Sequence, residues 1–413
     1  MKKVMMLGAT PSSIQFVKSA HEIGVAVVAV DMSETSAAKK IADKAYTQST
    51  ADIDKLVEIA KNEQIDGVVT GYDDFNTGIA VELCQRLGLP FYASGEQINV
   101  TKNKIGFKRL CEKFDIPVVR EYSVQDICFP CVVKPADSYS AKGISICRSK
   151  EMLDELIEQA LSFSKTKQFL IEKYMAPEKV DCVNIDYVLR NEEIKVSCIG
   201  DKKVIKQGDK APITSAVVYP SVHQEEFLET VDKKCQAMFK HLGMKDGTLF
   251  IECFYDEEGF HIYEMGYRVG GGQSSVLLNR IMDVDYLKLL INFAISGRMC
   301  NDATWNRIDP RFTESACGLL SVVKSGKIAE IIGLEEIAAI PEVINTTQYL
   351  HVGDVVDDRL IGTLGQSFAR FHIVAESRNR MRTVLQKIRS VLKVISSNGE
   401  NMVLPLYQDI DSE

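Results

Sequence analysis

The sequence contains no hydrophobic run long enough to cross a membrane. Its eleven cysteines are scattered without the paired spacing of metal sites, and no charged-then-apolar secretory leader precedes the first predicted strand. An excess of positive charge is also absent, because 49 lysines and arginines face 57 aspartates and glutamates, for a formal net charge of −8. We therefore expect a reduced, cytoplasmic protein whose partners are small molecules, with no nucleic acid and no membrane among them.

The glycine spacing of a nicotinamide-binding turn is missing too. Residues 8–13, which follow the first strand pattern, lack the spaced glycines of the full fingerprint, and this argues against a dinucleotide cofactor. Strand and helix patterns nevertheless alternate through residues 1–100 and predict a doubly wound parallel sheet. Asp73 and Asp74 follow the strand pattern at 67–70, at the edge where such sheets bind ligands. They either contact substrate or cap the helix that follows.

Two hydrophobic runs within residues 249–272 each carry one glutamate, Glu252 and Glu264, and a turn separates them. Alternate residues of a strand share a face, so a hairpin can direct both carboxylates at one point. With Arg268 close behind and glycines at 270–272, this arrangement suits Mg²⁺ bound to nucleotide phosphates. The alternative is a pair of solvated strand glutamates beside a basic loop.

Lysines and a small-residue loop precede this hairpin. Lys102, Lys104 and Lys108 crowd the start of an amphipathic helix, a pattern that usually marks a solvated face. Lys134 ends a buried strand run, however, and such a position can hold an ammonium near phosphate oxygens. The loop after it can cover polyphosphate with backbone N–H groups, unless it is only a flexible turn. Its further donors and its closing glycine are Ser138, Ser140, Lys142 and Gly143.

A buried strand pattern at 169–175 has an edge that can hydrogen-bond a purine, and Glu178 beyond it is placed to accept from ribose hydroxyls. In this order, the features resemble the ATP-grasp superfamily over nearly the whole chain. The resemblance is closest to the carboxylate–amine ligase and carbamoyl-phosphate-synthase-like branches. It implies a nucleotide held between two α+β subdomains, with ATP and Mg²⁺, or Mn²⁺ in its place, as cofactors.

The resemblance also implies a role for each matching residue. The nucleotide would contact Lys104, Lys134, Ser138, Ser140, Gly143, Glu172, Lys173, Tyr174 and Glu178. The metal would lie between Glu252 and Glu264. Lys142 and Arg268 would be catalytic, and the substrate would lie against Arg268, Gly271, Gly272, Asp73 and Asp74.

One position departs from the family pattern Glu-x-Asn-x-Arg. The chain has Gly266 between Glu264 and Arg268, so the usual third metal side chain is missing. Because Mg²⁺ commonly keeps several waters, a water can replace the asparagine oxygen. We expect weakened rather than abolished metal binding.

The chemistry that follows is ligation through an acyl phosphate. A small carboxylate, an amino acid or related metabolite, attacks the γ-phosphate of ATP, and an amine then displaces phosphate. Two alternatives remain: a biotin-carboxylase-like enzyme that activates bicarbonate to carboxylate a nitrogen, and a non-catalytic ATP-binding protein. A symmetric homodimer is the commonest state for a soluble enzyme, and nothing in the sequence improves on that expectation.

Length and composition predict more than one domain. We expect an α/β domain at 1–100, an ATP-grasp core at 101–308 with a lid subdomain at about 125–185, and a β-rich α+β segment at 309–413 that closes the cleft.

We predict structural or solvent-exposed positions for five further polar and aromatic residues. We expect Trp305 to be a packing anchor and His223 to start a helix. Lys202, Lys206 and Lys210 are expected to be solvated loop lysines rather than contacts of an anionic ligand.

Overall fold

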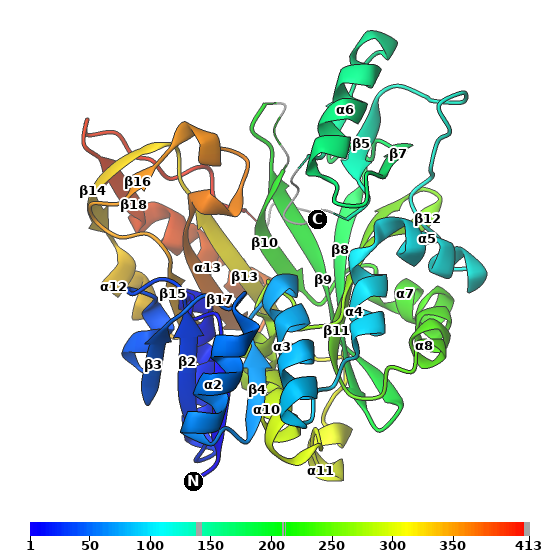
Figure 1. The fold of residues 1–413 in the computed structure, drawn as a ribbon. Helices are drawn as coiled ribbons and strands as arrows, with labels where there is room; N and C mark the ends of the chain where they lie inside the picture. Colours follow the sequence, from blue (N-terminus) through cyan, green and yellow to red (C-terminus); the bar gives the residue numbers. More distant parts are fainter. Residues whose placement is uncertain (138–142, 209, 211, 409–413) are drawn as a thin grey trace.

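The computed structural model describes residues 1–137, 143–208, 210 and 212–408 (Figure 1). The N-terminal part is a four-stranded parallel sheet in the order β3-β2-β1-β4, which confirms the predicted doubly wound sheet. Its elements are β1 (Lys3–Leu7), η1 (Pro11–Ser13), α1 (Ile14–Glu22), β2 (Ala26–Asp31), η2 (Ala37–Lys40), β3 (Lys44–Thr47), α2 (Ile53–Glu63), β4 (Gly67–Thr70) and α3 (Asp74–Leu87).

Local signals define two of these helices. Asp52 caps α2 by accepting from the backbone N–H of Lys55, and Asp73 caps α3 by accepting from that of Asn76. Gly88 ends α3 in the left-handed region at φ +66°. The capping alternative for Asp73 is therefore confirmed.

Two helices lead to a small lobe around an antiparallel sheet in the order β6-β5-β7. This lobe projects from the molecule at the top right of Figure 1, with α6 against the sheet. Its elements and the two helices before it are α4 (Gly95–Lys102), α5 (Lys104–Lys113), β5 (Cys131–Pro135), β6 (Ser145–Cys147), η3 (Lys150–Met152), α6 (Leu153–Phe163) and β7 (Phe169–Lys173).

The largest layer is an eight-stranded antiparallel sheet in the order β12-β11-β8-β9-β10-β13-β17-β15. It continues across residue 308, so strands of the expected core and of the C-terminal segment share one sheet. The strands are β8 (Asp181–Arg190), β9 (Glu193–Ile205), β10 (Ile213–Tyr219), β11 (Gly247–Asp256), β12 (Gly259–Gly266), β13 (Ser315–Val322), β15 (Val343–Gln348) and β17 (Ser367–Ala375).

Helices on this sheet join it to the N-terminal domain. Side chains of α7 and α8 share a buried cluster with β8 and β11, while α10 contacts α1, β4 and β11. Gly67 permits the approach of α10, because a Cβ there would lie 2.3 Å from the carbonyl oxygen of Ala294. The helices are α7 (Gln224–Thr230), α8 (Asp232–His241), α9 (Ser274–Met282), α10 (Tyr286–Ser296) and α11 (Asp302–Asn306).

The C-terminal part adds a second, three-stranded sheet in the order β16-β14-β18. Its elements, with the helices around them, are β14 (Gly326–Ile332), α12 (Leu334–Ala338), β16 (Val355–Val356), η4 (Asp358–Leu360), η5 (Leu364–Gln366), α13 (Arg378–Val391) and β18 (Lys393–Ser396). Across the described part of the chain, every helix is too short or too polar to traverse a bilayer.

Candidate functional site

The hairpin of β11 and β12 brings its two glutamates together. Glu252 and Glu264 are directly paired across the antiparallel strands, so both side chains lie on one face of the sheet. Within the described residues, Glu264 has no hydrogen-bond or ion-pair partner. Water reaches the carboxyl of Glu264. The surrounding protein nevertheless removes part of its hydration, and this desolvation, followed by repulsion from the charge of Glu252, raises its pKa. One carboxylate is thus available to a cation.

A buried lysine balances the other carboxylate. The Nζ of Lys202 lies 2.7 Å from Glu252 Oε2, and Tyr263 Oη donates to the same oxygen at 2.7 Å. Burial raises the pKa of Glu252, but Lys202 outweighs it, so the pKa lies below its usual value. The prediction that Lys202 is a solvated loop lysine is therefore wrong.

The prediction for Lys202 failed because of the length of β9. This strand continues to Ile205, where the sequence was interpreted as a loop. On this strand the side chain of Lys202 is only 12% exposed. Lys206 and Lys210 are exposed, as predicted.

Arg268 is held by an aspartate of the N-terminal domain. Its Nε and Nη2 donate to the two carboxylate oxygens of Asp74 at 2.8 and 3.0 Å, and its Nη1 donates to the carbonyl of Val269 at 2.9 Å. A guanidinium has five N–H groups, so one on each Nη remains. These two can still bind a second carboxylate at the end of the fork.

The ring of Phe250 fills the space that a side chain at Gly266 would occupy. Gly266 is the cross-strand partner of Phe250, and a Cβ at Gly266 would lie 2.3 Å from Phe250 Cε1. The guanidinium of Arg268 lies over the same ring, 4.9 Å from its centroid. Aromatic side chains often cover cross-strand glycines in sheets. The glycine that replaces asparagine at position 266 thus leaves room for the ring of Phe250. The sequence interpretation did not find this relation.

A buried ion triad connects α5 to the small lobe. Glu172 on β7 accepts from Lys108 at 2.7 Å and from Lys134 at 2.5 Å, and all three side chains are less than a tenth exposed. Burial raises the pKa of Glu172, but Lys134 and Lys108 outweigh it and hold the pKa below its usual value. Lys108 is therefore not part of a solvated face. Lys134 keeps two further N–H donors for a ligand.

The other predicted nucleotide residues lie along this lobe. The backbone N–H of Lys104 donates to Ala136 at 2.9 Å, which places the start of α5 beside the end of β5. Burial lowers the pKa of the Lys104 ammonium. Tyr174 is half-buried and Glu178 is exposed in the segment after β7.

Lys173 and the loop after β5 complete the set of predicted nucleotide residues. Lys173 is engaged by acids of the hairpin turn, with its Nζ 3.5 Å from Asp256 and 3.8 Å from Glu258. Gly143 adopts φ +74°, where a larger residue would be strained. The predicted donors Ser138, Ser140 and Lys142 lie outside the described residues.

The glycine run contacts an arginine from the C-terminal sheet. Arg370 Nη1 donates to the carbonyl of Gly272 at 3.1 Å, while a Cβ at Gly271 would meet open space. Arg370 is 8% exposed, its buried Nε has no partner, and no carboxylate of the described residues pairs with it. Sequence interpretation missed it, although a charged residue inside the apolar run of β17 was a signal.

The turn of the hairpin carries a second acidic cluster. Oxygen and nitrogen atoms of Asp256, Glu258 and His261 lie within 4.8 Å of one another. Lys173 already supplies a cation to both acids, and His261 contacts Asp256 at 2.7 Å. This cluster is therefore balanced without a metal, unlike Glu264.

Two expectations about single residues hold. His223 immediately precedes α7, where its ring lies 2.9 Å from Asp181 and stacks on Tyr255. Trp305 is buried under the guanidinium of Arg190, 4.8 Å from its centroid, and so anchors packing.

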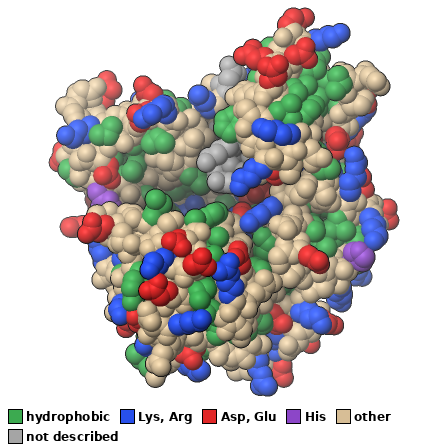
Figure 2. Space-filling model, in the orientation of Figure 1, with side chains coloured by type: hydrophobic (Ala, Val, Ile, Leu, Met, Phe, Trp, Pro, Cys, Tyr) green, Lys and Arg blue, Asp and Glu red, His purple; other side chains and the backbone are tan. Residues whose placement is uncertain are grey.

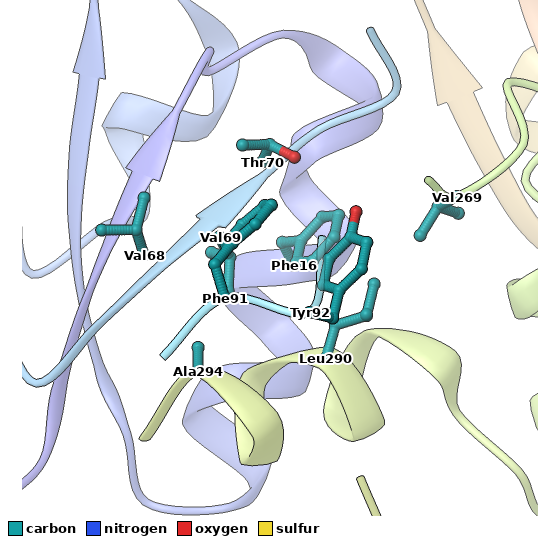
Figure 3. A pocket seen from close by; sticks show the side chains of 9 residues that line it. All are labelled: Phe16, Val68, Val69, Thr70, Phe91, Tyr92, Val269, Leu290 and Ala294. Carbon is teal, nitrogen blue, oxygen red and sulfur yellow. The ribbon is translucent and has the colours of Figure 1, made fainter. Parts of the chain in front are cut away.

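The hollow of the molecule lies between the lobe of α6 and the C-terminal part, with both cationic and anionic side chains in view (Figure 2). A separate enclosed space lies between the N-terminal sheet and α10, lined by Phe16, Tyr92, Leu290 and other mainly apolar side chains (Figure 3). Its volume of about 10 Å³ is at the lower limit for one water, so it is not a substrate site.

Two families match parts of this chain. Residues 105–282 match the family described as "D-ala D-ala ligase C-terminus", and residues 5–83 match "PylC-like, N-terminal domain". The formate-dependent phosphoribosylglycinamide formyltransferase of Histophilus somni (strain 129Pt) is 30% identical over 169 residues, or 38% of this chain and 43% of the relative. The chain thus spans less than half the length of the curated relatives it matches.

Solved structures cover almost the whole chain. The L-amino acid ligase from Bacillus licheniformis superposes with a TM-score of 0.80 at 16% identity, covering 96% of this chain and 99% of that one. The phosphoribosylglycinamide synthetase from Anaerococcus prevotii gives 0.75 at 16% identity, covering 96% and 100%. The biotin carboxylase from Campylobacter jejuni gives 0.76 at 15% identity, covering 95% and 91%. At these identities, the structures establish a shared fold.

Proposed function

We propose that this chain, which has the ATP-grasp fold, uses ATP and Mg²⁺ to activate a small carboxylic acid as an acyl phosphate and couples it to an amine. The observation that carries the proposal is the pairing of a free carboxylate, Glu264, with Glu252 across one hairpin, and Arg268 follows two residues after its second strand. The matched families and solved relatives support the fold assignment made from the sequence. They leave the acid and the amine open.

The residues fit a divalent cation. Glu264 and the second oxygen of Glu252 offer hard oxygen ligands, and the raised pKa of Glu264 reflects a cost that a cation removes. Bound there, Mg²⁺ would neutralise phosphate charge during transfer. The Gly266 position supplies no ligand, so waters would fill the remaining positions.

The chain's own groups then align the reactants. Arg268 uses its two remaining N–H groups to orient the acid, while Asp74 fixes the guanidinium. Lys134, held by Glu172, and Lys104 at the start of α5 bind phosphate oxygens. The acid oxygen bonds to the γ-phosphorus as the bond to ADP breaks. The amine nitrogen next bonds to the acyl carbon, and phosphate leaves with release of the amine proton.

Hydroxylamine tests this proposal without knowledge of the amine. It intercepts an acyl phosphate as a hydroxamate, so ATP, Mg²⁺ and hydroxylamine are combined with amino acids, other small carboxylates and bicarbonate in turn. We expect a hydroxamate from one class of organic acid, with ADP formed in equal amount. ADP formation that requires bicarbonate would support N-carboxylation instead. ATP binding without any acid-dependent ADP would support a non-catalytic binder.

A further inference from the structure

We propose that Cys131 and Cys147 form a reversible disulfide in the small lobe, and that Cys128 is the thiol through which oxidation enters. This oxidative modification site goes beyond the proposed ligase function and does not depend on it. It lies in the lobe at the top right of Figure 1, on the two strands that precede and follow the small-residue loop.

The two cysteines face each other across an antiparallel pair of strands. Cys131 on β5 and Cys147 on β6 are direct cross-strand partners. Directly opposed residues have Cα atoms about 4.5–5.5 Å apart, and a disulfide requires roughly 4.4–6.8 Å. Among the strands that the structure describes, no other two cysteines are paired in this way. The backbone therefore holds this pair at bridging distance.

Burial protects the pair while the lobe is closed. Both side chains are fully buried, in one cluster with Tyr122. Cys147 Sγ donates to the carbonyl of Ser149 at 3.1 Å. Burial, and then the charge and hydrogen bond of Cys147, raise the pKa of the Cys131 thiol to about 12. A thiol with so high a pKa stays protonated at neutral pH and reacts poorly. Oxidation therefore needs a more accessible thiol nearby.

Cys128 supplies this thiol. It is exposed, and only Phe129 and Pro130 separate it from Cys131, a spacing found among cysteines that exchange disulfides. The pKa of Tyr122 is raised by burial first, then by Cys128, which hydrogen-bonds its hydroxyl, and more weakly by Cys131. Tyr122 thus lies beside both cysteines. Sequence interpretation gave this spacing no role, because the partner of Cys131 lies on another strand.

The strand β6 provides the motion that exposes the buried pair. It has three residues, lies at the edge of its sheet and pairs only with β5. Segments with few buried contacts open locally at a lower free-energy cost than central strands. A disulfide would make the pairing of β6 with β5 covalent and hold this edge closed. The opening of β6 thus becomes dependent on the redox state of the two cysteines.

Exchange with a small-molecule disulfide, here glutathione disulfide, gives a balanced sequence of steps. The Cys128 thiolate attacks one sulfur, and the first glutathione leaves with the proton that Cys128 released. Once β6 opens, Cys131 attacks the sulfur of Cys128 and displaces the second glutathione. Cys147 then attacks the sulfur of Cys131 and restores the Cys128 thiol. Two protein thiols are oxidised to one disulfide, and glutathione disulfide is reduced to glutathione.

Peptide mapping of the full chain by tandem mass spectrometry tests the inference. The reduced protein is incubated with glutathione disulfide at neutral pH, alkylated and digested. We expect a disulfide that links Cys131 to Cys147 and disappears with dithiothreitol. Amide hydrogen exchange in β6 should slow by about tenfold or more in the oxidised chain, because the strand can no longer separate from β5.

Single variants separate the entry thiol from the bridge. Cys128→Ser should slow formation of the bridge by at least about tenfold, because the buried thiols react poorly. Cys300→Ser changes a partly exposed cysteine after α10 and should leave the rate unchanged. Cys147→Ser should stop the sequence at a disulfide between Cys128 and Cys131.

Three results would overturn the inference. They are a wild-type chain without the link between Cys131 and Cys147, an equal rate of bridge formation in Cys128→Ser, and unchanged hydrogen exchange in β6 after oxidation. The map of the wild-type chain needs no substitution, so it decides the matter even if Cys147→Ser does not fold.

Discussion

Glu264 is the residue on which the proposed metal site depends. Replacing it by glutamine removes a like charge that faces Glu252 without a partner. We expect Glu264→Gln to raise the Tm of the metal-free protein by about 1–2 °C, because the relieved repulsion is partly screened by solvent. Mg²⁺-dependent turnover should fall about 10²-fold or more. Scanning calorimetry with and without Mg²⁺ measures the first effect, and ADP release measures the second.

Glu257→Gln is the control for this variant, since Glu257 is an exposed acid on the same hairpin. It should change neither quantity. If Glu264→Gln destabilises the metal-free protein and keeps full turnover, Glu264 is not a metal ligand.

Gly266 leads to a prediction about packing. An asparagine side chain at this position, as in the family pattern, would collide with Phe250. Gly266→Asn alone should lower stability by about 1–3 kcal/mol through overpacking. Phe250→Ala in the same chain makes room, so the double variant should be more stable than the sum of the two single effects predicts. Urea denaturation of the four proteins measures this coupling. Strict additivity would show that the two side chains do not compete for one space.

For single residues, sequence interpretation identified the functional residue types more reliably than their interaction partners. It placed Glu252 and Glu264 on one hairpin because strand alternation is local information. It missed the pairing of Lys202 with Glu252, since that contact depends on β9 and β11 lying two strands apart in the sheet. Contacts between distant segments leave no local pattern.

Among the elements, α5, β5 and β7 meet at the Lys108, Glu172 and Lys134 triad. Glu172→Gln leaves two buried ammonium groups without a counter-charge and should cost about 3–5 kcal/mol. Glu112→Gln, an exposed acid on α5, should cost less than about 0.5 kcal/mol. Chemical denaturation at neutral pH measures both. A small effect of Glu172→Gln would mean that water reaches the triad in solution.

The triad also predicts a pH dependence with a definite sign. The pKa of Glu172 is lower in the folded protein than in the unfolded chain, because the two lysines outweigh burial. Its ionised form therefore stabilises the fold above about pH 5, and this contribution is lost as the pH falls through the lower folded pKa. The stability difference between wild type and Glu172→Gln should shrink with acidification. A difference that stays constant below that pH would contradict the assignment.

Element boundaries were predictable where caps and buried periodicity coincide. The strand predicted at 67–70 is β4, and the helix predicted to follow it is α3, which begins at Asp74. The edge strand β3 was missed because its four residues are mostly exposed and carry no apolar alternation.

Across the whole molecule, the pair of Asp74 and Arg268 joins the N-terminal domain to the hairpin. Asp74→Asn keeps the size of the side chain and removes the charge, so we expect a loss of about 2 kcal/mol in stability. Because Asp74 positions Arg268, KM for the acid should rise while the affinity for ATP stays unchanged. Asp54→Asn, which breaks an exposed ion pair with Arg86, is the control and should be neutral. A fall in kcat with unchanged KM would show that Asp74 does not act through acid binding.

The sequence predicted the parallel N-terminal sheet and the ATP-grasp resemblance of the chain, because both depend on ordered local patterns. It could not show that β10, β13 and β17 form one continuous sheet, since pairing between β10 and β13 joins segments separated by five helices and the hairpin.

The most direct test of the central claim follows oxygen atoms. The acid that supports ADP formation is labelled with ¹⁸O in its carboxylate and incubated with ATP, Mg²⁺ and the amine, and the released phosphate is analysed by mass spectrometry. Activation as an acyl phosphate predicts one ¹⁸O atom in each phosphate, because the carboxylate oxygen that attacks the γ-phosphorus leaves with it. Unlabelled phosphate formed together with the amide product would contradict the account.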